Sequence, residues 1–153
     1  MAQLAALELL PAPHAGNVAQ GLLRFETAGK GLTDITSDVT VWLAQSRLLK
    51  GTLTLFCRHT SAGLLINENA SAAVQRDLIR WLDRLAPEDT GYEHDDEGPD
   101  DMPAHIKAML TGSALTIPFA GNRLLLGTWQ GIYLVEHRAR SHTREIVVTG
   151  IGE

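Results

Sequence analysis

Polar side chains follow two neighbouring apolar segments of the chain, at the point where each segment ends. His59 closes the segment TLTLFCRH and is followed by Thr60 and Ser61, whereas the next segment, AGLLIN, runs into Glu68 and Asn69. If the two segments form a β-hairpin, these groups converge at one end of a sheet, as sites on rigid scaffolds usually do. The alternative is a core histidine that hydrogen-bonds one backbone carbonyl. On the first hypothesis His59, Glu68 and Asn69 are catalytic, and Thr60 and Ser61 bind substrate.

Asp77 and His105 each stand at the flank of a predicted amphipathic helix. Asp77 flanks the stripe that contains Val74 and Trp81, and His105 flanks Ile106 and its apolar neighbours. A flank position faces both solvent and core, so either residue could contribute to a site, Asp77 as a catalytic carboxylate, or make a cap or a salt bridge.

His94 lies in an acidic segment, residues 88–101 (EDTGYEHDDEGPDD). A charge run of this kind is usually a solvated loop, but its length is typical of functional loops. Imidazole favours zinc and carboxylates favour magnesium or manganese. We expect His59, His94 and His105 to lie within ligand distance of one another, with a carboxylate of Glu68 or of the acidic loop nearby, and we assign Asp101 of this loop a catalytic role. The alternative is three separate hydrogen-bonding histidines, since the spacing matches no linear zinc motif.

Positively chargeable residues gather near the C-terminus, over residues 137–144 (HRARSHTR). The guanidinium groups of Arg138 and Arg144 could bind a phosphate through paired hydrogen bonds. The alternative is a solvated turn between two strands.

The whole chain has the proportions of one ordinary domain. It has 153 residues, 44% of them hydrophobic, and 13 Lys and Arg against 18 Asp and Glu give a net charge of −5. This sign argues against nonspecific binding to nucleic acid or to an anionic membrane. A lone cysteine, Cys57, excludes an intrachain disulfide and fits a reducing compartment. Without a basic N-terminal region or a membrane-length apolar run, we expect a cytoplasmic protein.

No GxSxG, P-loop or GxGxxG motif occurs, so we expect no nucleotide cofactor. The alternation of apolar residues predicts an α+β domain, a mainly antiparallel sheet or sandwich with about three helices. We expect residues 1–17 to form a loose leader and residues 18–153 the single domain. The predicted helices begin near Ser37, Asn69 and Pro103, and the predicted strands cover 20–27, 52–59, 62–67, 113–119, 123–128, 131–137 and 144–150.

Four stretches of the chain resemble the YjbQ family, whose members are often labelled secondary thiamine-phosphate synthases. They are FCRHTSAGLLINENA (56–70), YEH with PDDMPAHIKAMLTG (92–112), RLLLGTWQGIYLVEH (123–137) and the closing TGIGE. The LGTWQGI segment is highly specific, and the likeness runs from about residue 18 to the C-terminus. The resemblance implies a compact α+β domain, a homotrimer and a polar pocket with histidines. The positions that match the family's polar motif are His59, Glu68, Asn69, Asp77, His94, Asp101 and His105, with Arg144 as a C-terminal basic residue.

The family label implies weak formation of thiamine phosphate from a pyrimidine diphosphate and a thiazole phosphate. A small phosphorylated substrate and a divalent metal, zinc, magnesium or manganese, follow from this chemistry, because a leaving diphosphate needs its charge neutralised. Two other hypotheses use the same residues. One is a metal-dependent hydrolase of another phosphorylated or damaged metabolite, and the other is a binding protein without catalysis.

Overall fold

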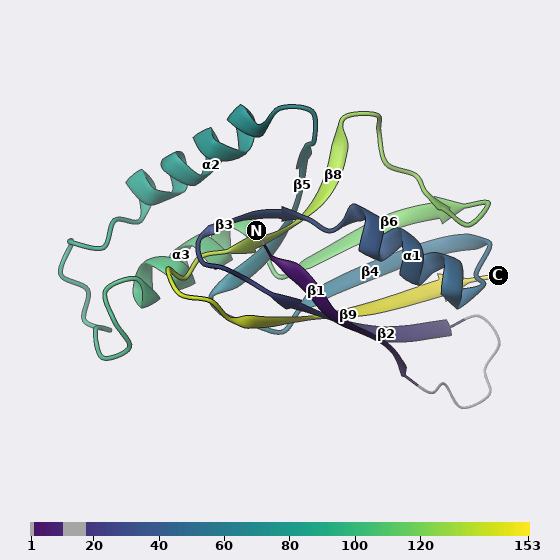
Figure 1. Cartoon of the computed structure of the whole chain (residues 1–153), viewed down its shortest axis with the longest axis horizontal. Helices are drawn as coiled ribbons and strands as arrows, with labels where there is room; N and C mark the ends of the chain where they lie inside the picture. The colour runs from purple at the N-terminus through teal and green to yellow at the C-terminus, as the bar shows by residue number, and fades with distance from the viewer. Residues whose placement is uncertain (1, 11–17) are drawn as a thin grey trace.

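Nine strands and three helices make up the described part of the chain, residues 2–10 and 18–153 of a computed structural model (Figure 1). The helices are α1 (Thr36–Ser46), α2 (Ala72–Leu85) and α3 (Asp101–Thr111). The strands are β1 (Gln3–Leu10), β2 (Val18–Glu26), β3 (Gly31–Asp34), β4 (Lys50–Cys57), β5 (Ala62–Glu68), β6 (Ala114–Ala120), β7 (Arg123–Leu124), β8 (Gln130–Glu136) and β9 (Thr143–Gly152).

The strands form two sheets in which every described pairing is antiparallel. The larger sheet has the order β1-β2-β9-β4-β6-β7, and the smaller one has the order β3-β8-β5. This arrangement, together with three helices, confirms the predicted α+β domain with mainly antiparallel sheets. The last strand of the chain, β9, lies in the middle of the larger sheet, between β2 and β4.

One apolar core joins the two sheets and α1. Alternate residues of β4, Leu53, Leu55 and Cys57, are buried in it, as their period-two spacing predicts. The smaller sheet contributes side chains such as Leu64, and α1 contributes Trp42. The buried face of each element is therefore fixed by its own sequence period.

The two strands expected to form a hairpin, β4 and β5, lie in different sheets. β4 pairs with β6 and β9, whereas β5 pairs with β8 and with no other described strand. The turn at 58–61 therefore carries the chain from one sheet to the other. Because a strand rises about 3.3 Å per residue, the seven residues of β5 place Glu68 roughly 20 Å from this turn. The hairpin hypothesis is wrong, and so is the convergence of polar groups that depended on it.

The ends of α2 and α3 explain where the site residues stand. Ser71, not Asn69, caps α2, and its side chain accepts a hydrogen bond from the amide of Ala73. α3 begins at Asp101, two residues before Pro103, and ends at Thr111, with Gly112 as its C-cap. Figure 1 shows α2 standing away from the larger sheet, and α3 follows it across the acidic loop.

The N-terminal segment departs from the predicted loose leader. Residues 3–10 form the edge strand β1, which pairs with β2 from Gln3 opposite Glu26 to Leu10 opposite Gln20. The rest of the predicted leader, residues 1 and 11–17, lies outside the described residues. None of the described helices combines the length and the apolar character needed to cross a membrane.

Candidate metal centre

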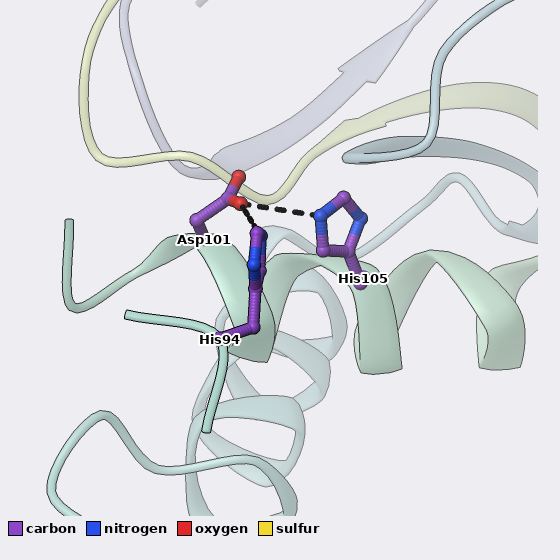
Figure 2. A group of neighbouring side chains, drawn as sticks. All are labelled: His94, Asp101 and His105. Carbon is purple, nitrogen blue, oxygen red and sulfur yellow. Dashed lines mark hydrogen bonds and ion pairs between the residues drawn. The ribbon is translucent and has the colours of Figure 1, made fainter. Parts of the chain in front are cut away.

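Three side chains offer ligand atoms that all lie within 4.8 Å of one another: His94, Asp101 and His105. Asp101 and His105 are four residues apart and therefore share one face of α3, and His94 comes from the acidic loop before that helix. Asp101 Oδ2 lies 2.8 Å from His94 Nε2 and 3.2 Å from His105 Nε2. Figure 2 shows both imidazoles directed at this carboxylate from different sides.

Arg138 fixes the carboxylate at the centre. Its Nη1 donates to Asp101 Oδ1, so that the other oxygen, Oδ2, remains for the two imidazoles. Its Nε and Nη2 donate to Asp100 Oδ2 at 3.1 Å and to the carbonyl oxygen of Glu97 at 2.9 Å. Only 3% of the Asp101 side chain is exposed. The guanidinium therefore holds both the buried carboxylate and the end of the acidic loop in place.

The turn between the two sheets orients His105. Its Nδ1 lies 3.0 Å from the carbonyl oxygen of Thr60, which can only accept a hydrogen bond, so Nδ1 carries a proton. In a neutral ring Nε2 then has a lone pair, and this lone pair faces the carboxylate oxygen of Asp101. Two electron-rich atoms 3.2 Å apart need a cation, either a proton or a metal ion. This carbonyl–histidine–ligand arrangement is the usual outer-shell support of a metal-binding imidazole.

The second imidazole also stands among carboxylates. His94 Nδ1 lies 3.3 Å from Asp96 Oδ1, in addition to the contact of Nε2 with Asp101. The hydrogen bond to Asp101 is the main reason that the pKa of His94 is raised above its ordinary value. Two imidazole nitrogens and one carboxylate oxygen match a three-ligand zinc set with an open fourth position.

His59 is not part of this group, which revises the expected trio of His59, His94 and His105. Its Nε2 lies 2.8 Å from the backbone nitrogen of Glu145 and accepts that N–H, so Nε2 has no lone pair left for a metal. Burial, followed by the positive charge of Arg144, lowers the pKa of His59. His59 instead lines a cavity of about 420 Å³, which His105 also lines. Asp101 occupies the place that the sequence hypothesis gave to His59.

Three further residues predicted as catalytic lie apart from the centre. The Glu68 carboxylate accepts the N–H of Ser71, at the start of α2. Asn69 donates to the carbonyl oxygen of Gln130. Asp77 is exposed on α2 and pairs with Arg80 at 3.1 Å. Each of these polar groups therefore has a structural partner of its own.

Arg144, which the sequence suggested as a phosphate ligand, is buried. Its guanidinium binds both oxygens of Glu136, at 2.7 and 2.6 Å, and the hydroxyl of Ser61 at 3.0 Å. Burial alone would raise the pKa of Glu136, but the hydrogen bond from Arg144 brings it below its ordinary value. Because Arg138 is also held by carboxylates, neither guanidinium has its paired N–H groups free for a phosphate.

Sequence reasoning missed the partners that hold these groups, Glu136 and the backbone groups of Thr60 and Glu145. Nothing in the residue types marks a carbonyl or an amide as a partner, because chain topology brings it there. One signal was available: Asp101 and His105 have the i, i+4 spacing of a shared helix face. Beginning the helix at Asp101 would have paired them.

Comparisons with known proteins agree with the fold. The model of the family described as "UPF0047 protein YjbQ-like" matches residues 22–153. A UPF0047 protein of Synechocystis is 46% identical over 88% of this chain and 92% of its own, and YjbQ of Escherichia coli O157:H7 is 41% identical over 88% and 98%. A crystal structure of a YjbQ/UPF0047 family protein from Clostridium acetobutylicum has a TM-score of 0.77 and 38% identity over 83% of this chain and 96% of that chain. The chain therefore belongs to the YjbQ (UPF0047) family.

Proposed function

We propose that this protein is a divalent-metal-dependent enzyme that acts on a small phosphorylated substrate, with His94, Asp101 and His105 holding zinc. The observation that carries the proposal is the contact between Asp101 Oδ2 and His105 Nε2 at 3.2 Å. The carbonyl of Thr60 fixes one proton of this ring on Nδ1, so the contact needs a cation at Nε2, either a second proton or a metal ion, and we assign the metal ion. Two imidazoles favour zinc over magnesium or manganese, which prefer oxygen ligands.

The guanidinium groups of two arginines are already paired with carboxylates, which supports a bound metal. Arg138 and Arg144 are each neutralised by carboxylates, Asp100 and Asp101 in one case and Glu136 in the other. Another cation is therefore needed to offset the charge of a phosphate at this place. A bound metal supplies that charge at its open position, and Arg138 keeps the buried carboxylate aligned toward it.

We infer a thiamine-phosphate-synthase-type transfer, at low rate, as the reaction. The likeness to the YjbQ family supports this choice, together with a centre suited to neutralising a leaving diphosphate. In this reaction a pyrimidine methylene carbon loses diphosphate and forms a bond with the ring nitrogen of a thiazole phosphate. The residues of this chain bind and orient the phosphorylated partners.

Complementation of a bacterial strain that lacks its main thiamine-phosphate synthase tests the reaction. We expect the wild type to restore growth without thiamine, and Asp77→Asn to restore it equally, because Asp77 lies outside the centre. His105→Ala should fail while remaining folded and expressed. Rescue by His105→Ala at the level of the wild type would contradict the proposal.

A metal-dependent hydrolase is the second candidate, because a three-ligand set leaves a position for water. A screen of phosphoesters with zinc, manganese and magnesium separates the two candidates. Release of phosphate that disappears in His105→Ala, without complementation, would favour the hydrolase.

We also propose a homotrimer, following the family resemblance. Large apolar side chains on α2, Trp81 and Leu85, are about half exposed, and Trp129 is more exposed still. A trimer interface that includes α2 would cover such side chains. Light scattering should give about three times 16.6 kDa at micromolar concentration, and a mass near that of one chain would contradict the trimer.

A further inference from the structure

A cavity of about 420 Å³ adjoins the metal centre, between the 58–61 turn and the C-terminal half of α3. His105 is in its wall, so the cavity and the proposed zinc share one side chain. Its other walls include Thr60, Ala62, Met109 and Ser113, and no Asp, Glu, Lys or Arg lines it. A volume of this size accommodates a small organic molecule. These walls are therefore suited to an uncharged part of a ligand.

His59 supplies a hydrogen-bond donor in this uncharged wall. Its Nε2 lies 2.8 Å from the backbone nitrogen of Glu145, and an amide N–H can only donate. Nε2 therefore accepts, which an imidazolium could not do, so the ring is neutral and its single proton is on Nδ1. Among the described residues none accepts a hydrogen bond from Nδ1. His59 is one of the residues that line the cavity, so this N–H is available to a ligand bound there.

We propose that His59 determines specificity by donating its Nδ1–H to a nitrogen or oxygen acceptor on the uncharged part of the substrate. The phosphate of the same substrate would lie at the metal centre, so this step rests on the proposed function. Zinc ligation by His59 and proton abstraction through its Nε2 are both excluded by the hydrogen bond to Glu145. The substrate class is a phosphate ester with a compact, neutral organic group that carries an acceptor.

Met109 adds a contact surface for a flat group. It lines the same cavity, and it is 77% exposed, so its flexible thioether can adapt to an incoming ring. Sulfur–aromatic contacts of methionine are favourable. A planar heterocycle with a ring nitrogen would use both Met109 and the donor of His59.

The ring tautomer is tested on the whole protein by a long-range ¹H–¹⁵N NMR spectrum, with His59→Gln to assign the signals. At pH 7.5 we expect a protonated Nδ1 and an unprotonated Nε2 for His59. A proton on Nε2, alone or together with Nδ1, would overturn the proposal. The measurement needs neither a ligand nor activity.

Selectivity is tested by equilibrium binding of phenyl phosphate and the three pyridyl phosphates to the zinc-loaded protein at pH 8. One hydrogen bond is worth about 3- to 10-fold in affinity, so at least one pyridyl isomer should bind that much more tightly than phenyl phosphate. His59→Phe should remove this preference, measured as the ratio of the pyridyl to the phenyl phosphate affinity within the same variant. His59→Gln, which keeps a donor, should retain part of the preference.

The possible results distinguish a failure of this inference from a failure of the proposed function. If phenyl phosphate binds but no pyridyl isomer is preferred, or if the preference survives in His59→Phe, His59 is not the specificity donor and the metal proposal stands. If none of the four phosphates binds the zinc-loaded wild type, the phosphate site is contradicted. The proposed function and the role of His59 are then both wrong. Thermal melting of each variant checks that it is folded.

Discussion

His105 and Thr60 couple a helix to a turn between two sheets through one hydrogen bond of 3.0 Å, from Nδ1 to the carbonyl oxygen. The bond settles which ring nitrogen of His105 faces Asp101. It also makes the geometry of the centre depend on how closely α3 packs against β5.

Asp101→Asn should lower zinc affinity by more than 10-fold, because the amide presents less negative charge to the metal than the carboxylate does. Competition with a chromogenic chelator, on protein purified without a histidine tag, measures the change. Asp77→Asn is the matched control, since it makes the same substitution on an exposed residue of α2. Equal zinc affinities of the two variants would contradict Asp101 as a ligand. Less than a tenth of an equivalent of metal in the reconstituted wild type would contradict the metal centre itself.

Gly63→Ala should destabilise the protein by about 1–3 kcal/mol through crowding between β5 and α3. A Cβ at Gly63 would lie 2.0 Å from Thr111 Oγ1 and 2.9 Å from the carbonyl oxygen of Gly112. The same carbonyl accepts the N–H of Leu64 at 2.9 Å, so the backbone cannot move away without losing that bond. Urea unfolding measures the loss of stability.

Gly31→Ala is the control for this crowding, because the nearest atom to an added Cβ there is 4.0 Å away. Its free energy of unfolding should stay within about 0.5 kcal/mol of the wild type. A similar effect of both substitutions would show that backbone freedom, rather than the close approach of α3, explains the result.

The strands and helices follow from local patterns, which is why most of them could be predicted. Alternation placed β4, and Gly112 marked the end of α3. The pairing of β4 with β9 joins residues about ninety positions apart, and no local pattern contains it. The predicted hairpin failed for this reason, since two consecutive strands need not share a sheet.

The candidate site, like the fold, could be predicted only in part from the sequence. Loop context identified His94, a helix flank identified His105, and the family resemblance identified Asp101, but their grouping depends on the helix start and on Arg138. Arg144 illustrates the limit: a guanidinium near the C-terminus suggests phosphate, and only the fold reveals that Glu136 occupies it.

Arg144→Met should cost about 3–5 kcal/mol of unfolding free energy, because it leaves the Glu136 carboxylate buried without its partner. Only 4% of the Arg144 side chain and 3% of the Glu136 side chain are exposed. Arg58→Met is the matched control: it breaks an ion pair with Glu145 in which 53% of the Arg58 side chain is exposed, and should cost about 0–1 kcal/mol. Urea unfolding measures the free energy of unfolding of both variants. A loss below about 1 kcal/mol for Arg144→Met would contradict the structural role given to the pair of Arg144 and Glu136.

The buried His137 should make the protein less stable as the pH falls from about 6.5 toward 4. Burial, followed by the charge of Lys107, lowers the pKa of His137 from 6.5 to about 4 in the folded chain. In this interval the unfolded chain binds a proton at His137 that the folded chain does not, so acid favours unfolding. The difference of about 2.5 pH units corresponds to about 3 kcal/mol, fully present above pH 6.5 and lost near pH 4.

His137→Gln isolates this contribution, because glutamine does not titrate and its amide can still meet the hydroxyl of Thr111, which lies 3.0 Å from His137 Nε2. Unfolding free energies of both proteins should be measured in urea at pH 7.5, 6.5, 5.5 and 4.5. The wild type should lose more stability than the variant on acidification, and the difference should grow toward pH 4.5. Other histidines titrate in both proteins and cancel in this comparison. Parallel pH profiles would mean that His137 binds its proton as readily in the folded chain as in the unfolded one.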